Sequence, residues 1–62
     1  MIAYRVIAKN LKTGIRVERQ QIDGHLITEE ALAWRTAQDF AQAQEQRFGD
    51  QWSAQVEAYT PR

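Results

Sequence analysis

The sequence predicts an α+β domain with the element order ββαβ, in which one long helix covers one face of a three-stranded antiparallel sheet. Three stretches, at residues 2–9, 15–22 and 52–59, alternate apolar and polar residues with the period of two that is typical of β-strands. A fourth stretch, residues 29–48, repeats its apolar residues with the period of an α-helix. The 62 residues contain no repeat and no linker, so we expect a single compact domain over residues 1–62.

The first two strands are expected to pair as a β-hairpin. Asn10 to Gly14 separate them, and Gly14 can take the positive φ that closes such a turn. If residues 11–14 form the loop, Ala8 lies opposite Val17 and Asn10 lies opposite Ile15. The face of the hairpin that should meet the helix then collects Ile2, Tyr4, Val6, Ala8, Ile15 and Val17.

A helix is predicted after residues 23–24, which we expect to end the second strand. Thr28 suits the N-cap because its hydroxyl can accept a hydrogen bond from a free N–H of the first turn. Ile27 and Leu32 have the spacing of a hydrophobic staple, and Gly49 that of a left-handed terminator. At about 100° per residue, the stripe that should face the sheet consists of Ala33, Trp34, Ala37, Phe40, Ala41, Gln44 and Phe48.

The last strand, residues 52–59, should return beside the first. A helix of about 20 residues is about 30 Å long, which matches a strand of eight or nine residues and brings the chain back along the sheet. A right-handed crossover then gives the strand order 2-1-3 with both neighbouring pairs antiparallel. Pro61 ends the pairing because it lacks an N–H. One face of the sheet is therefore covered by the helix, and the other face is bare.

Composition narrows the class of protein. There is no cysteine, so neither a disulfide nor a thiolate metal site is expected, and no apolar run approaches the roughly 20 residues that cross a bilayer. We therefore expect a cytoplasmic protein without a membrane partner. The net charge is zero, but residues 1–22 carry five Lys and Arg against one Glu, whereas residues 23–62 carry three Arg against seven carboxylates. This asymmetry, +4 against −4, makes an acidic partner one of the possibilities.

No residue set in the sequence supports catalysis, so we expect no enzyme activity, no cofactor and no metal. His25 is the single histidine and has no second ligand at a known metal spacing. Glu29 and Glu30 are adjacent on the helix and point about 100° apart, so they do not form a carboxylate pair for acid–base chemistry. The large rings of Trp34, Phe40, Phe48 and Trp52 are assigned by their periodicity to the core rather than to a ligand pocket.

The bare sheet face and the edge of the second strand predict a small non-enzymatic protein-interaction module, which binds a second copy of itself or acts as an adaptor. Nucleic-acid binding through the basic hairpin is the alternative, although Glu18 and Glu57 share the same face and no aromatic cluster is exposed there. For the basic hairpin taken alone, a solvated sheet face is the favoured interpretation, ahead of an acidic protein partner and of nucleic acid. A catalytic role in a larger assembly is a third possibility, for which no residue argues. Ile7 is expected to be exposed among charges, which a solvated face explains poorly. The residues expected to contact a partner are Arg5, Ile7, Lys9, Arg16, Glu18 and Tyr59.

Overall fold

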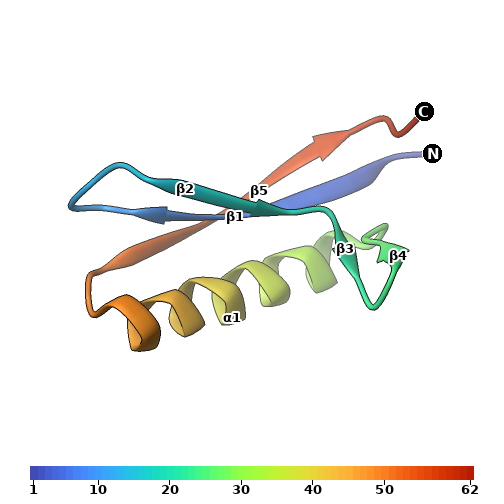
Figure 1. Ribbon diagram of the computed structural model, residues 1–62. Helices are drawn as coiled ribbons and strands as arrows, with labels where there is room; N and C mark the ends of the chain where they lie inside the picture. The colour runs from blue at the N-terminus through green and yellow to red at the C-terminus, as the bar shows by residue number, and fades with distance from the viewer.

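The structure, a computed structural model that describes residues 1–62, places one helix beneath a three-stranded sheet and leaves the upper face of the sheet without a covering element (Figure 1). The sheet order is β2-β1-β5 and both pairings are antiparallel, which confirms the predicted topology. Both termini lie at the same end of the molecule (Figure 1). The elements are β1 (Ala3–Asn10), β2 (Arg16–Arg19), β3 (Gln21–Ile22), β4 (His25–Leu26), α1 (Glu30–Phe48) and β5 (Trp52–Tyr59).

The β1–β2 hairpin has the predicted register. Ala8 lies opposite Val17, and the N–H of Asn10 donates to the carbonyl oxygen of Ile15 at 2.8 Å. Gly14 has the positive φ of 79° that the turn requires. Ile15, which we expected to be covered by the helix, lies just before β2 and is 57% exposed.

Asn10 holds the hairpin loop together. Its side-chain oxygen accepts hydrogen bonds from the N–H groups of Lys12 (2.8 Å) and Thr13 (3.1 Å), and its amide nitrogen donates to Asp50 at 3.1 Å. Asn10 is the only buried polar residue, and these three bonds use both its donor and acceptor capacity. They tie the hairpin loop to the segment between α1 and β5.

The second strand, predicted over residues 15–22, is interrupted at residue 20, so this prediction was wrong. β2 ends at Arg19, and the chain then forms a small separate hairpin from β3 and β4. Asp23 and Gly24 do not simply end a strand: both have positive φ, 51° and 81°, as a two-residue hairpin turn that matches the twist of its strands requires. This hairpin brings Ile27 to β1, where it accepts a hydrogen bond from the N–H of Tyr4.

α1 begins one residue later than predicted. Glu29, not Thr28, is the N-cap, and its side chain makes no capping bond. The predicted staple is also wrong, because Ile27 is buried in the core whereas Leu32 is exposed. The helix ends as predicted, with Gly49 in the left-handed conformation and its N–H donating to the carbonyl oxygen of Glu45. As the only helix, α1 lacks the apolar length that crossing a bilayer requires.

The core lies between α1 and the two strands β1 and β5, against which the helix packs. Small residues on the helix, Ala33, Ala37 and Ala41, are buried and allow a close approach to the sheet. Phe40 packs against both clusters of the core. The buried members of these clusters are Val6, Ile27, Ala33 and Ala37 in one, and Ala8, Ala41 and Trp52 in the other.

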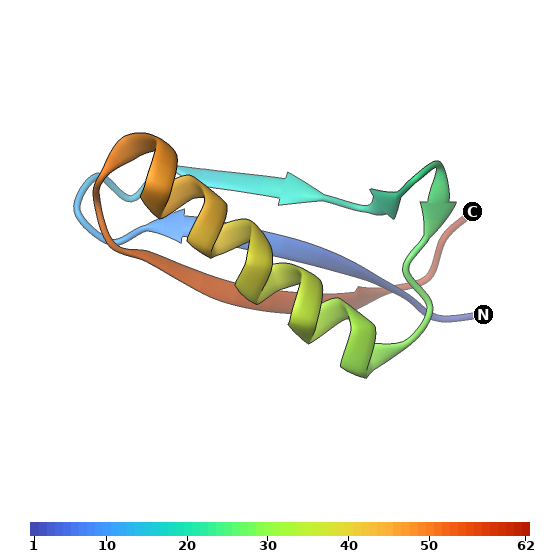
Figure 2. The same cartoon turned by 90° about the horizontal axis from the view of Figure 1, so that it is seen from below.

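Two rings assigned to the core by helical periodicity lie mainly at the surface. Trp34 is 43% exposed and Phe48 is 56% exposed. The reason is the position of the helix, which runs over β1 and β5 and leaves β2 to one side (Figure 2). With only two strands beneath it, α1 buries a narrow stripe of alanines. Trp34 lies on the flank of that stripe, and Phe48, in the last turn, borders the space between α1 and β2. Ile2, also expected in the covered face, precedes β1 and is exposed.

Candidate protein-interaction surfaces

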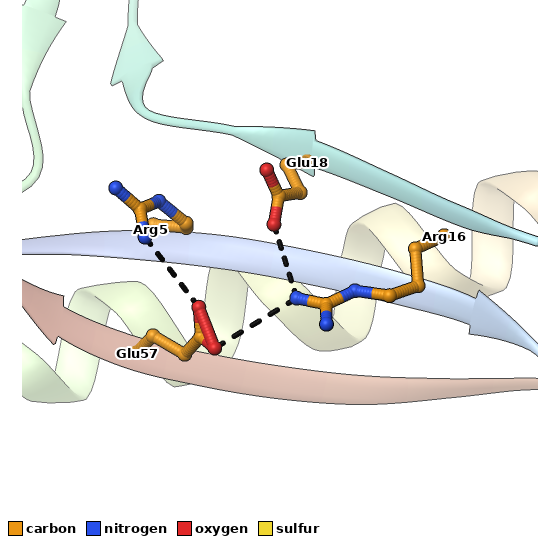
Figure 3. Close-up of polar contacts among 4 residues, drawn as sticks. All are labelled: Arg5, Arg16, Glu18 and Glu57. Atoms are coloured by element: carbon orange, nitrogen blue, oxygen red, sulfur yellow. Dashed lines mark hydrogen bonds and ion pairs between the residues drawn. The ribbon is translucent and has the colours of Figure 1, made fainter.

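The bare face of the sheet carries a chain of ion pairs that runs across all three strands (Figure 3). Arg5 of β1 and Glu57 of β5 are cross-strand neighbours, with Nη1 and Oε1 3.5 Å apart. Arg16 of β2 reaches Glu18 at 3.0 Å on its own strand and Glu57 at 3.7 Å across the sheet. Two of the three basic residues predicted to contact a partner, Arg5 and Arg16, are therefore already paired with carboxylates of the same chain.

Ile7 is buried, which corrects the expectation that it is an exposed apolar residue. It lies at the centre of the bare face, opposite Glu18 and Gln55, yet 0% of its surface is exposed. No helix covers this face, so its neighbours on the three strands must do so, with the aliphatic parts of their long side chains over the isoleucine and their polar ends in water. The bare face therefore offers a partner no apolar anchor at Ile7.

The remaining predicted contact residues lie on the same face. Tyr59 of β5 is half-buried beneath Arg5, whose guanidinium carbon is 4.7 Å from the centre of the tyrosine ring. Lys9 is half-buried and has no ion pair. All six predicted residues thus share one surface. Ion pairs within the chain occupy Arg5, Arg16 and Glu18, whereas the Tyr59 hydroxyl and Arg5 Nε are buried without a hydrogen-bond partner.

The two edges of the sheet differ in how much unpaired backbone they present. The N–H groups of Tyr4 and Asn10 point away from β5, to Ile27 and Ile15. Since successive residues of a strand direct their backbone groups to opposite sides, the odd-numbered residues of β1 pair with β5 and the even-numbered ones with β2. The free edge of β2 therefore presents only Arg16 and Glu18. The free edge of β5 presents the N–H and C=O groups of Ala54, Val56 and Ala58, whereas the N–H of Trp52 already donates to Glu45 Oε1 at 3.1 Å.

An exposed tryptophan flanks the free edge of β5. Trp34 lies about 120° around α1 from Phe40, which lines a hollow facing Arg19 of β2. Trp34 therefore lies on the opposite flank of the helix, the flank toward β5. The first turns of α1 extend beyond β5 (Figure 2). It precedes Phe48 by 14 residues, about 21 Å of helix. Because Phe48 is beside Trp52, Trp34 is level with Ala58.

On the other flank, two adjoining hollows separate α1 from β2, and we call them together the β2–α1 groove. The first, of about 330 Å³, is bordered by the apolar side chains of Ile15, Val17, Phe48 and Trp52. The second, of about 350 Å³, lies between Arg19 of β2 and the helix. Gln44 borders both hollows. Periodicity had assigned Phe48 and Trp52 to the core. Trp52 is buried there, as predicted, whereas the offset of the helix from β2 leaves Phe48 mostly exposed as a wall of this groove.

The structure contains no group of three or more His, Cys, Asp or Glu that could hold a metal ion. Comparison of the chain with known protein families, curated proteins and solved structures finds no match.

Sequence reasoning identified both outer strands as unpaired edges but favoured the second strand over β5, and it missed the groove. The β5 edge had a readable signal, because Glu57 is the only charged residue between positions 51 and 60, and a long edge strand usually carries more charges. The sequence contains no comparable signal for the groove, because the groove depends on the lateral position of α1 over the three strands.

Proposed function

We propose that this chain is a small non-enzymatic interaction module that forms a two-fold homodimer by pairing the free edge of β5 with the same edge of a second copy. The observation that carries the proposal is the unpaired backbone of β5, whose eight residues include a single charge. Natural edge strands are usually kept short or protected by charges, bulges or prolines, whereas β5 has eight residues, one charge at Glu57, and no bulge or proline before Pro61.

The β5 sequence is self-complementary in the antiparallel direction. With Val56 facing its own copy, Ala54 faces Ala58, and Glu57 faces Gln55, so no like charges are opposed. The outward backbone groups of these residues then form closely spaced hydrogen-bonded pairs. The result is a continuous six-stranded antiparallel sheet with both helices on the same face.

The flank of α1 adds apolar contact to this pairing. Trp34 lies on the helix flank toward the β5 edge, and the two-fold axis brings it close to the partner's strand. In the proposed dimer the two α1 helices run antiparallel. The N-terminal half of each helix, which extends beyond β5, therefore lies beside the C-terminal half of the partner's helix, which crosses toward β2 of its own chain (Figure 2). A tryptophan provides large contact area and is among the residues most enriched at interface centres.

The accessible surface of the isolated chain is also larger than that of a typical monomeric folded protein of the same mass. Its accessible area is 4520 Å², whereas a monomeric folded protein of 7.2 kDa exposes about 4,100 Å². Only 10 of the 62 residues are buried. A second copy on the β5 edge would cover Trp34, Val56 and Ala58, all of which are at least partly exposed.

Sedimentation velocity over a concentration series, from micromolar to millimolar, tests the proposal. The wild-type chain should change from monomer to dimer. Ala58→Pro should remain monomeric, because it removes an N–H that points to the free edge and none that pairs with β1. Ala58→Thr is the matched control, which retains the N–H and should still dimerise.

The proposal is contradicted by a wild-type chain that stays monomeric throughout the series, or by an Ala58→Pro variant that dimerises as strongly as Ala58→Thr. Circular dichroism of both variants establishes that each keeps its fold. Dimerisation should change little with salt, since backbone pairing and apolar burial carry it.

Nucleic-acid binding through the basic hairpin has less support. Arg5 and Arg16 are paired with Glu18 and Glu57, which leaves three hairpin cations without a carboxylate partner: Lys9, Lys12 and Arg19. A phosphate-binding surface would lose affinity steeply as salt rises. Titration of single-stranded and duplex oligonucleotides at low and moderate salt separates this alternative from protein binding.

A further inference from the structure

We propose that the β2–α1 groove binds an extended peptide segment in which an acidic residue precedes an apolar residue by two positions. This site is separate from the β5 edge, so one copy of the chain can use both. Three features of the groove specify the ligand. They are an apolar hollow, a cationic hollow beside it, and the short free edge of β2, which lies between the two hollows and solvent.

The apolar hollow accommodates one hydrophobic side chain. Ile15 and Phe48, at its rim, are each more than half exposed, and the Trp52 ring closes its end 5.9 Å from the ring of Phe48. A volume of about 330 Å³ is ample for a leucine or phenylalanine side chain. Filling the hollow would remove from water apolar surface that the chain alone leaves exposed.

The neighbouring hollow is positively charged. Arg19 and Arg47 border it with Asp39 as the single acid, and neither arginine has an ion pair within the chain. Their guanidinium carbons lie over aromatic rings instead, Arg19 over Phe40 at 5.1 Å and Arg47 over Phe48 at 5.3 Å. These contacts hold the two cations at the walls of the groove, where they can bind a carboxylate.

The edge of β2 determines the spacing of the two side chains. A segment that pairs with the free backbone groups of Arg16 and Glu18 places its residues opposite Val17 and Arg19 on the groove side. These two residues are about 6.7 Å apart along the strand. In the antiparallel direction, the residue opposite Arg19 comes first and the residue opposite Val17 follows two positions later, which gives the acidic-x-apolar order.

The groove wall also contains polar groups that the chain leaves unpaired. The indole nitrogen of Trp52 and the side-chain oxygen of Gln44 are buried and have no hydrogen-bond partner. Both residues border the apolar hollow. An unpaired buried polar atom is costly, so a ligand whose backbone reaches this wall gains from supplying the missing partner.

Amide chemical-shift titration in the Ala58→Pro background tests the site without dimerisation. The probe is the capped peptide Thr-Val-Glu-Thr-Leu-Thr-Val, and the control peptide has Lys in place of Glu. The Glu peptide should shift the amides of Arg16, Glu18 and Arg19 and bind about tenfold more tightly than the Lys peptide. The double variant Arg19→Glu/Arg47→Glu should reverse the preference, whereas Arg35→Glu, exposed and away from the groove, should leave it unchanged.

Absence of shifts at millimolar peptide, shifts confined to β5, or equal affinity for the Glu and Lys peptides would each overturn the inference. None of these results bears on homodimer formation, which is measured on the wild-type chain. Conversely, a monomeric wild type leaves the groove and its peptide test intact.

Discussion

Arg5 and Glu57 lie directly opposite each other on β1 and β5, and their side chains join at 3.5 Å on the bare face of the sheet. Glu57 also lies 3.7 Å from Arg16, so it is shared by two cations. All three side chains are more than a quarter exposed, and exposed ion pairs contribute little to stability.

Replacing Glu57 should therefore have a small effect on folding. Glu57→Gln keeps the shape of the side chain and removes its charge, and should lower the free energy of unfolding by no more than about 1 kcal/mol. Urea denaturation at low and high salt measures this, and the difference from wild type should shrink at high salt. A much larger loss of free energy of unfolding that does not depend on salt would show that these ion pairs are essential to the stability of the fold.

Ile7 should be far more important to stability than its position on a bare face suggests. Ile7→Ala removes a fully buried side chain and should lower the free energy of unfolding by about 2–4 kcal/mol. Ile15→Ala, at an exposed position near the same hairpin, should cost less than about 1 kcal/mol. Urea denaturation of the two variants side by side decides the point, and equal effects would contradict the burial of Ile7.

Asn10 should be the most sensitive polar residue. Asn10→Ala removes the acceptor for two loop N–H groups and the bond to Asp50, and should cost about 1–3 kcal/mol. Thr13→Ala removes only an exposed bond to the N–H of Ile15 and should cost less than about 0.5 kcal/mol. Thermal unfolding measures the stability of both variants. An Asn10→Ala variant as stable as Thr13→Ala would show that the hydrogen bonds of Asn10 do not stabilise the hairpin loop.

Phe40 and Phe48 should differ although both lie on the predicted helix stripe. Phe40 packs against both core clusters and is half-buried, so Phe40→Ala should cost about 2–3 kcal/mol, below the full range for a buried ring. Phe48→Ala removes a mostly exposed ring and should cost about 1 kcal/mol. Chemical denaturation compares them, and the reverse order would mean that the position of α1 over the sheet is wrong.

The strand order and the register of the first hairpin were predictable because they depend on local patterns. The alternation around Val6 and Val56 and the loop ending at Gly14 define strands, and the length of the helix defines the return path. The β3–β4 hairpin was missed because its strands have only two residues each, too few to show alternation, although Asp23-Gly24 is a known hairpin turn pair.

The surfaces were harder to predict because they depend on how the elements pack. Helical periodicity gives the direction of Trp34 and Phe48 around α1 but not the lateral position of the helix, which leaves both rings beyond the edge of the core. Strand alternation likewise assigns Ile7 to the bare face, but it does not show that neighbouring side chains fold over it.

Hydrogen exchange of individual backbone amides, measured at low and high protein concentration, tests the β5 pairing most directly. The amides of Ala54, Val56 and Ala58 point to the free edge, so they should exchange rapidly in dilute solution and become protected as concentration rises. The amides of Arg16 and Glu18, on the free edge of β2, serve as the internal control and should exchange rapidly at both concentrations. If the three β5 amides exchange as rapidly in concentrated solution as in dilute solution, the proposed dimer does not form.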